Sequence, residues 1–347
     1  GFSVMYGLRY SWFAALGPYR VNQYEPVSPR DPTTISGGTD YTTGKIIQSY
    51  NGFEPRLVAR LNLTATTSLK FSFNRMYQYL QLISNTTAAL PTDRWKISDA
   101  YLKPQFGDQI SLGIFKNWKK DTYETSLELY YKRLTNVADY RNGTNLTLLE
   151  APETAILQGT GRSYGAELLV RKNSGFLTGW ISYTFAQTEY LINSPYPEDK
   201  YRNGLYFPAN FNKPHTINVV LNYRVSRRTS WSMNWVYSTG RPITYPLDKY
   251  FVGNIYVPNY TVRNQATIPD YHRLDIGLTV DPIPEAKRKW QSGWAFSIYN
   301  LYARQNAYSI FFRTKNDNIL QFYNKVNAYK LSIFGTLIPS ITYNFTY

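Results

Sequence analysis

The stretch Tyr329–Tyr347, YKLSIFGTLIPSITYNFTY, alternates between apolar and small polar side chains along almost its whole length. One parity carries Tyr329, Leu331, Ile333, Leu337, Ile341, Tyr343, Phe345 and Tyr347, and the other carries Lys330, Ser332, Thr336, Ser340, Thr342, Asn344 and Thr346. A period of two residues is that of a β-strand. In lipid every backbone group must be paired within the protein, so a long strand with one apolar face is typical of a membrane-spanning barrel. The stretch therefore predicts one long transmembrane strand at the end of the chain.

The composition favours the same fold over its competitors. The chain has 347 residues, with 33 Tyr, 8 Trp and 18 Phe, and no segment approaches the roughly 20 consecutive apolar residues of a transmembrane helix. A convincing period near 3.6 residues is also absent from the sequence, which disfavours a helical soluble protein. We therefore expect an all-β chain in which residues 1–347 form part of a single barrel domain. The chain has no cysteine, so it has no disulfide and no thiolate site.

Connections between the expected strands alternate between short and long. The short ones are at 65–68, 119–122, 173–175, 226–229 and 282–291, and the long ones are near 16–53, 84–107, 141–161, 193–213, 245–269 and 313–328. Outer-membrane barrels have short periplasmic turns and long external loops. The pattern predicts an antiparallel β-barrel wall of about 12 strands with both ends on the periplasmic side. A soluble β-sandwich or propeller explains neither strands of about 15 residues nor loops that are long on one side only.

The alternation recurs in the strands between these connections. Leu57, Ala59 and Leu61 oppose Arg60 and Asn62, for example, and Leu274, Ile276 and Leu278 oppose Arg273 and Asp275. We expect the apolar set to face lipid and the polar set to face the lumen.

Several phrases in the second part of the chain carry a family resemblance. They are RSYGAEL (162–168), GFLTGWISYT (175–184), YFPANFNKPH (206–215), WVYSTGRPIT (235–244), HRLD (272–275), SIYNLYARQNAYSIFF (297–312) and the Pro-containing IPSI (338–341). In this order they resemble the C-terminal half of the barrel of TonB-dependent outer-membrane transporters, particularly of the Bacteroidota type. Each phrase alone is a weak signal, and the ordered set is a strong one.

The resemblance implies a barrel of about 22 strands, of which this chain supplies roughly strands 11 to 22. The plug, the TonB box and the first strands would then precede Gly1, which we expect not to be the native N-terminus. Unpaired strand edges are untenable in lipid, so the missing half must exist in the same protein. The alternative is that the 12 or so strands close on themselves as a smaller passive pore.

The charge of the chain, +15, comes from basic residues that are spread over the expected turns. They include Lys70, Lys119, Lys120, Arg171, Lys172, Arg227, Arg228, Lys287, Arg288 and Lys289. On the short-turn side these side chains would face the phosphates of the inner leaflet, so outer-membrane lipids are the expected partner. The alternative is that they are solvated turn residues that favour solubility. They form no continuous groove and no known nucleic-acid module, so we expect no nucleic-acid partner.

Catalytic chemistry is not expected. The two histidines, His215 and His272, both begin strands after long loops, and neither lies in a hydrolase-like spacing of Ser and Asp. The sequence shows no Gly-rich phosphate loop and no metal-ligand cluster, so we predict no enzyme activity, no metal and no cofactor.

Two functional hypotheses remain open. The resemblance implies TonB-dependent active uptake of a siderophore, cobalamin, a glycan or a peptide, with TonB acting through the missing N-terminal region and a surface lipoprotein covering the barrel in some relatives. A transporter-like barrel that serves as a structural subunit of a larger outer-membrane complex would have the same sequence features. Lumen parity and nearness to the long loops select the wall residues Arg60, Asn74, Gln78, Glu128, Glu167 and Asn234 and the loop residues Trp95, Tyr201, Arg202 and Tyr250 as candidate substrate contacts.

Overall fold

The computed structural model describes residues 1–84, 94–142, 144, 146, 149–252, 255–260, 262–282, 291–314 and 326–346. The strands within these residues are β1 (Phe2–Leu16), β2 (Tyr19–Tyr24), β3 (Ile35–Tyr41), β4 (Ile46–Asn62), β5 (Thr67–Gln78), β6 (Leu80–Ile83), β7 (Arg94–Ile97), β8 (Gln105–Trp118), β9 (Tyr123–Tyr140), β10 (Ile156–Lys172), β11 (Leu177–Leu191), β12 (Phe207–Pro208), β13 (His215–Arg224), β14 (Thr229–Ser238), β15 (Pro242–Ile243), β16 (Pro246–Val252), β17 (Ile255–Tyr260), β18 (Ala266–Thr267), β19 (Tyr271–Val280), β20 (Gln291–Tyr299), β21 (Ser309–Thr314), β22 (Val326–Leu331) and β23 (Ile338–Thr346). Four short 3₁₀ turns complete them: η1 (Pro32–Thr34), η2 (Pro152–Thr154), η3 (Pro197–Asp199) and η4 (Tyr201–Gly204). Among the residues described, none of the helical segments could span a membrane.

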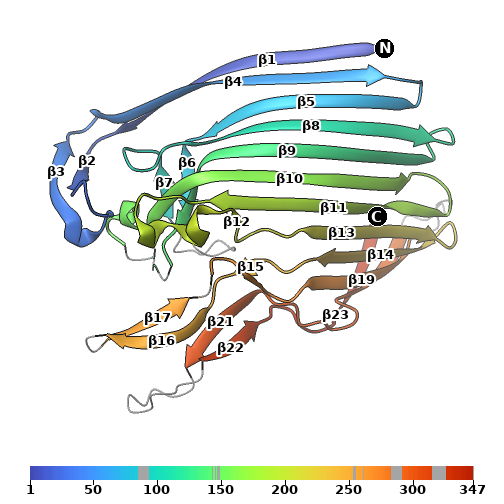
Figure 1. Cartoon of the computed structure of the whole chain (residues 1–347). Helices are drawn as coiled ribbons and strands as arrows, with labels where there is room; N and C mark the ends of the chain where they lie inside the picture. The colour runs from blue at the N-terminus through green and yellow to red at the C-terminus, as the bar shows by residue number, and fades with distance from the viewer. Residues whose placement is uncertain are drawn as a thin grey trace.

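One large antiparallel sheet dominates the structure. Its strands follow one another in the order β1-β4-β5-β8-β9-β10-β11-β13-β14-β19-β20-β23, with β12 pairing beside β11 (Figure 1). The strands reach 17 residues in β4 and 18 in β9. The path matches the predicted meander of about 12 strands, and the all-β fold is confirmed.

Short connections lie together at one end of this sheet and long ones at the other. The short turns follow β4, β8, β10 and β13, at the places expected from the sequence. The register pairs Phe2 with Leu61 and Thr346 with Gln291, so the first and last strands both have their chain ends at the short-turn end. The direction of the first and last strands is therefore as predicted.

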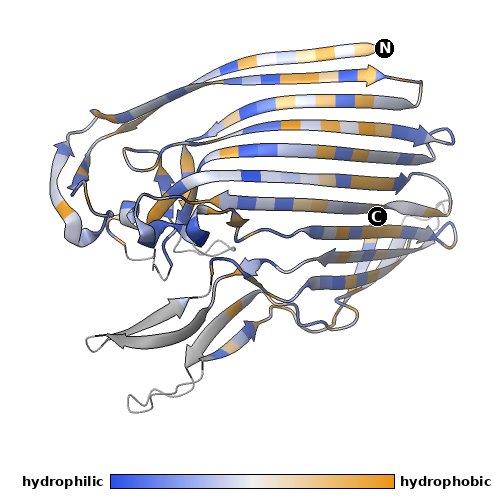
Figure 2. Cartoon of the chain, in the orientation of Figure 1, coloured by the Kyte–Doolittle hydropathy of each residue, from blue (hydrophilic) through white to orange (hydrophobic). Residues whose placement is uncertain are grey.

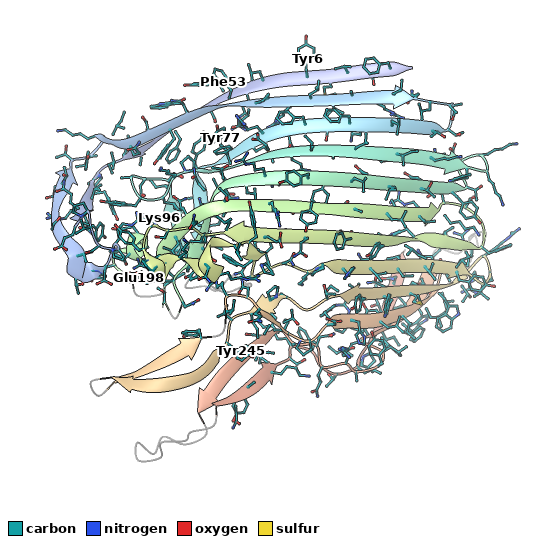
Figure 3. All side chains as sticks on the ribbon, in the orientation of Figure 1. Tyr6, Phe53, Tyr77, Lys96, Glu198 and Tyr245 are labelled. Carbon is teal, nitrogen blue, oxygen red and sulfur yellow. The ribbon has the colours of Figure 1, made fainter. Side chains whose placement is uncertain are left out.

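The two faces of the sheet differ in polarity. Directly opposite residues share a face, and the register joins Phe71, Leu112 and Leu129 in one apolar row across β5, β8 and β9. The adjacent row on the other face is polar, and in it Ser72 and Ser111 are hydrogen-bonded at 2.6 Å. Orange and blue bands alternate along these strands in Figure 2, and Tyr6 projects away from β1 in Figure 3. The apolar rows are exposed, as expected for a wall that faces lipid.

The long loops carry structure that the sequence analysis did not anticipate. Four of them contain two-stranded hairpins or ladders: β2–β3, β6–β7, β16–β17 with β15–β18, and β21–β22. The buried apolar clusters also lie at this end of the sheet, and one of them joins Ile83 and Leu102, both in the connection between β5 and β8, to Ile156 at the start of β10. The loop end is therefore a folded layer, with its own core, on top of the sheet.

The prediction of one long strand over 329–347 is wrong. The chain bends between β22 and β23, so that β22 pairs with β21 in a loop hairpin while β23 pairs with β20 in the large sheet. Phe334 has φ 54°, in the left-handed region, and Gly335 follows it. The buried side chain of Asn300 donates hydrogen bonds to the carbonyl oxygens of Phe334 and Thr336, both at 3.3 Å. These contacts replace ladder pairing at the bend, because the Asn300 amide takes the place of a neighbouring strand.

The sheet does not close on itself. Within the described residues, β1 pairs only with β4, and β23 pairs only with β20. In this structure the strands therefore do not form the small closed pore that the sequence left as an alternative.

Candidate functional site

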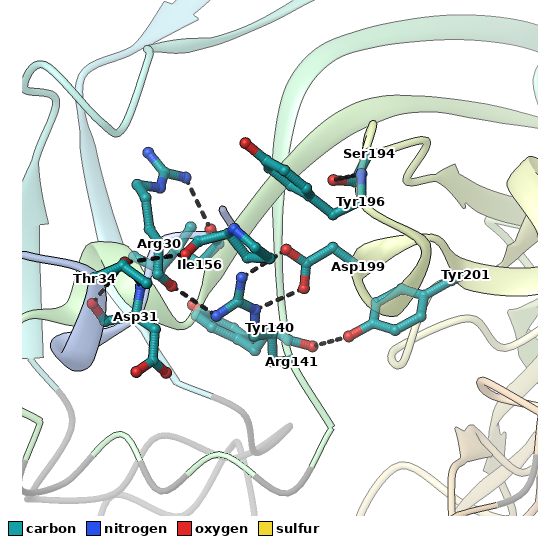
Figure 4. Close-up of polar contacts among 11 residues, drawn as sticks. Arg30, Asp31, Thr34, Tyr140, Arg141, Ile156, Ser194, Tyr196, Asp199 and Tyr201 are labelled. Carbon is teal, nitrogen blue, oxygen red and sulfur yellow. Dashed lines mark hydrogen bonds and ion pairs between the residues drawn. The ribbon is translucent and has the colours of Figure 1, made fainter. Parts of the chain in front are cut away.

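A buried ion pair ties two external loops together. Arg141 follows β9, and its Nε and Nη2 donate to the two carboxylate oxygens of Asp199 in η3, each at 2.6 Å (Figure 4). Arg141 also donates from Nη1 to the carbonyl oxygen of Arg30 at 2.8 Å, and the Arg30 guanidinium reaches the carbonyl oxygen of Ile156 at 3.5 Å. One guanidinium therefore holds three loops in a fixed arrangement, because both ends of its planar fork are used.

A second guanidinium extends this network to the next loop. Arg263, between β17 and β18, pairs with Asp139 at the end of β9 and donates to Oδ1 of Asn142 at 2.6 Å. It lies 5.0 Å from the ring centroid of Tyr201, whose hydroxyl donates to the carbonyl oxygen of Tyr140 at 2.9 Å. Burial raises the pKa of Tyr201 to about 12, with partial compensation from the charge of Arg263. These contacts join the loops into a frame around the external mouth of the sheet.

A cavity of about 500 Å³ opens beside this frame. Its walls come from the ends of β13, β14 and β19, from the segment after β20, and from Ile333 in the bend before β23. Its lining residues are mostly apolar and aromatic, with two basic side chains: Phe211, Lys213, Ser238, Thr239, Gly240, Arg241, Ile268, Pro269, Tyr271, Asn306, Ala307, Tyr308 and Ile333. A concave apolar pocket with a few convergent polar groups is the usual form of a ligand site.

The backbone around Arg241 is held tightly. The Gly240 amide donates to Oδ1 of Asp270 at 2.8 Å, and the Ile268 amide donates to the Arg241 carbonyl at 3.0 Å. A side chain on Gly240 would place its Cβ 1.6 Å from the carbonyl oxygen of Ile268, so only glycine fits between these two segments.

The guanidinium of Arg241 is half-buried and engages no hydrogen-bond or ion-pair partner in the described part of the chain. Burial lowers the pKa of Arg241 below its ordinary value, because no carboxylate compensates for the lost hydration. Lys213 contributes a second positive charge to the same cavity. An anionic ligand would restore the solvation that this guanidinium loses on burial, since a charge-assisted pair replaces its lost water.

Sequence reasoning did not select these two basic residues. Lys213 lies in YFPANFNKPH and Arg241 in WVYSTGRPIT, two of the phrases that carry the family resemblance. Lys213 and Arg241 are 28 residues apart in the sequence (241 − 213). The pairing of β13 with β14 brings them to the same cavity.

The structure brings two of the predicted wall residues together. Glu128 on β9 and Glu167 on β10 are directly opposite in the register, on the polar face. Neither carboxylate has an ion-pair partner among the described residues, so two like charges share one place on the lumen wall.

The other wall residues are separated. Asn74 lies opposite Gln109 in the middle of β5, and Gln78 ends β5 with its amide donating to the Leu80 carbonyl at 3.0 Å. Asn234 lies opposite Asp275, which pairs with Arg273 at 2.9 Å. All three positions have the expected lumen parity.

Arg60 lies in the same cross-strand row as Glu128 and Glu167, because the register pairs Arg60 with Lys70, Lys70 with Gly113 and Gly113 with Glu128. It is two residues from the end of β4, next to a short turn, and it lines an open cavity of about 940 Å³ together with Lys70 and Glu124. The expected nearness to the long loops is therefore wrong for Arg60, and also for Glu128 and Glu167, which lie closer to the short-turn ends of β9 and β10 than to their loop ends. This larger cavity faces the short-turn mouth, away from the loop layer.

The predicted loop residues have different surroundings. Trp95 on β7 is 66 % exposed, and Arg202 is exposed and donates to the carbonyl oxygen of Tyr206 at 3.2 Å. Tyr201 is only 7 % exposed and packs edge-on against Phe207, so its surroundings are those of a structural anchor in the frame. Tyr250 lies on β16, and its side chain is outside the described residues.

The histidines lie on the apolar face near the loop end. Nδ1 of His215 is 2.9 Å from the Tyr183 hydroxyl, and Nδ1 of His272 is 2.8 Å from the Tyr302 hydroxyl. A group of three or more potential metal-ligating side chains is not found among the residues described.

Comparisons with known proteins agree with this architecture. The chain is similar to the ferric-catecholate import receptor Fiu from E. coli K12 (16 % identity, TM-score 0.51, covering 88 % of this chain and 39 % of that one). It is also similar to the FrpB iron transporter from Neisseria meningitidis (13 % identity, TM-score 0.56, covering 99 % of this chain and 43 % of that one). A third similar structure is the ferric citrate transporter FecA (12 % identity, TM-score 0.51, covering 86 % of this chain and 38 % of that one). At these identities the likeness establishes the fold, and the chain spans about two-fifths of the length of each.

No curated protein sequence matches the chain significantly. A family model described as "TonB dependent receptor-like, beta-barrel" matches residues 1–301. The chain therefore belongs to the TonB-dependent receptor family of outer-membrane β-barrels, whose members are receptors and transporters and not enzymes.

Proposed function

We propose that this chain is part of the barrel of a TonB-dependent receptor that takes up an anionic nutrient, and that the cavity at Arg241 is its first binding site. The observation that carries the proposal is a half-buried guanidinium with no acidic partner among the described residues, inside an aromatic-lined cavity at the loop end. Family membership supports uptake across the outer membrane as the purpose of such a site.

An anionic, partly aromatic ligand fits this cavity best. Arg241 and Lys213 provide positive charge, while Phe211, Tyr271 and Tyr308 provide flat apolar surface. Three of the similar structures are named for iron uptake, one for ferric catecholates and one for ferric citrate. A negatively charged ferric chelate combines the two properties that the lining favours. A neutral glycan or a neutral peptide would leave the guanidinium without a counterion.

The open edges of the sheet support the proposal that the chain forms about half of a larger barrel. β1 and β23 each present a row of backbone groups without a partner in the described structure, and lipid cannot satisfy them. Further strands of the same protein, a plug and a TonB box are therefore part of the proposal. The wall residues Asn74, Gln78, Glu128, Glu167 and Asn234 would then line the path below the cavity.

Arg241→Gln tests the binding site. In the full-length receptor, purified in detergent, we expect the affinity for a ferric tris-catecholate or ferric citrate to fall at least tenfold, because hydrogen bonds to a charged group contribute about 1.5–3 kcal/mol. Lys45→Gln, in the turn before β4, removes an exposed positive charge from the same end of the sheet and serves as the matched control. Equal affinities of both variants and the unchanged receptor for both chelates would contradict the site.

The alternative function, a structural subunit of an outer-membrane complex, predicts a different result. Cells in which this protein is the sole candidate receptor for these chelates would then take up neither chelate, whether or not Arg241 is present. The protein would also co-purify with other subunits in fixed stoichiometry. Uptake of either chelate that depends on both TonB and Arg241 would exclude this alternative.

A further inference from the structure

A row of charged residues crosses five neighbouring strands on the outward face. The register pairs Arg75 on β5 with Asp108 on β8, Asp108 with Arg133 on β9, Arg133 with Arg162 on β10, and Arg162 with Glu189 on β11. These strands are consecutive in the sheet (Figure 1). Directly opposite residues share a face, so all five side chains lie on the side of the apolar rows.

The row lies at the height of the lipid headgroups on the loop side. On β8, Trp118 marks the short-turn end of the outward face, and Asp108 is ten positions further along the strand. At about 3.3 Å per residue and a strand tilt of about 40°, this spacing corresponds to about 25 Å along the membrane normal. That is the height of the apolar band of an outer-membrane barrel, so the charged row begins where this band ends. Tyr131 and Tyr164 form the next row toward the apolar band.

The two ends of the row are neutralised within the protein. Arg75 grips Asp108 through Nε and Nη2 at 2.6 and 2.8 Å, and Arg162 donates from Nε to Glu189 at 2.7 Å. Aromatic rings hold both of these guanidinium groups in place: Arg75 lies 5.4 Å from the ring centroid of Phe106, and Arg162 lies 4.1 Å from that of Tyr206.

The centre of the row is not neutralised. Both carboxylates are engaged by the flanking arginines, and the exposed side chain of Arg133 makes no hydrogen bond, ion pair or ring contact with the described residues. Three guanidinium groups and two carboxylates leave one net positive charge, at Arg133. It faces the outer leaflet, where an aromatic surface and an apolar surface lie directly below it.

We propose that Arg133 binds the phosphate group of an anionic lipid in the outer leaflet, with the acyl chains of that lipid lying on the rows that contain Tyr131 and Leu129. A guanidinium fork matches the geometry of phosphate oxygens, and the ion pairs on both sides keep neighbouring arginines from folding over it. The apolar rows below Arg133 supply contact area for acyl chains. A free anion has no acyl chains, so this contact favours a lipid as the ligand.

The test uses the full-length receptor in a mild detergent, titrated with phosphatidylglycerol or with phosphatidylcholine of the same acyl chains, with bound lipid counted by native mass spectrometry. We expect tighter binding of phosphatidylglycerol, and we expect Arg133→Gln to weaken it about fivefold. Lys132→Gln is the matched control, because it removes a positive charge from the adjacent position of β9, whose side chain lies on the lumen face opposite Gln109. The control should bind as the unchanged receptor does, and Arg133→Lys should recover most of the loss.

Three results would overturn the proposal. They are equal losses in Arg133→Gln and Lys132→Gln, equal binding of the two lipids, and full competition by inorganic phosphate, which would identify a free-anion site. If Arg133→Gln does not fold, as judged by circular dichroism, salt provides the second measurement. Raising the salt concentration from about 50 to about 500 mM must then weaken the binding of phosphatidylglycerol and leave the binding of phosphatidylcholine unchanged. Binding of phosphatidylglycerol that does not weaken with salt rejects the proposal.

Discussion

Arg141 and Asp199 form a two-pronged ion pair across two loops that are 58 residues apart in the chain, with both donor–acceptor distances at 2.6 Å. The Asp199 side chain is only 4 % exposed and that of Arg141 23 %. A pair this well buried is costly to break from one side, because the remaining charge keeps its desolvation without its partner.

Asp199→Asn should loosen the loop layer while leaving the sheet folded. Removal of one partner of a buried pair costs about 3–5 kcal/mol, so we expect amide exchange in residues 192–214 to accelerate strongly while exchange in β9 and β10 stays slow. Asp40→Asn is the control, because it breaks the exposed pair with Arg20, which contributes little. Unchanged exchange in Asp199→Asn would show that the pair does not hold the loops.

Tyr201 should make the loop layer sensitive to alkaline pH. Its pKa in the folded protein is raised to about 12, whereas it is about 10 in an unfolded chain, so the unfolded state loses the phenolic proton first as pH rises. The stabilisation is complete below pH 10 and declines by about 1.4 kcal/mol per pH unit between pH 10 and 12. The protection factors of residues 192–214, which correct exchange rates for base catalysis, should therefore fall over that range, and Tyr201→Phe should reduce this fall. Burial also raises the pKa of the neighbouring Tyr190, so part of the fall should remain.

Gly240→Ala should disrupt the cavity, because its Cβ would lie 1.6 Å from the carbonyl oxygen of Ile268. We expect a destabilisation of about 2 kcal/mol or more, together with loss of chelate binding. Gly7→Ala on β1 is the matched control, since a Cβ there meets nothing within 4 Å. Calorimetry and binding of the same chelates measure the two effects, and a normal affinity in Gly240→Ala would contradict the close packing.

Leu129→Arg should report which face touches lipid. Leu129 lies in the middle of the outward rows of β9 and is 50 % exposed, and an arginine at the bilayer midplane costs about 2–4 kcal/mol. Ser126→Arg places the same charge on the polar face of the same strand and should cost much less. Denaturant unfolding in lipid vesicles gives both values, and similar costs for the two variants would mean that the faces are assigned wrongly.

The large sheet could be predicted from the amino-acid sequence. The period of two in segments such as 271–280, together with the alternation of short and long connections, specified an antiparallel meander of about 12 strands and its apolar face, because both signals are local. The phrases around Arg162, Lys213 and Arg241 also indicated the family, which the comparison with known families established.

The bend at Phe334 and the contents of the loop layer could not be predicted in the same way, because they depend on contacts between distant segments. The alternation in 329–347 continues through the bend, and only the buried amide of Asn300, from a different segment, shows why the strand is interrupted. The same limit applies to Arg241 and Lys213, since their shared cavity exists only after β13 and β14 pair. A periodic pattern records which face a side chain takes, whereas a site made by several loops depends on contacts between residues that the sequence keeps far apart.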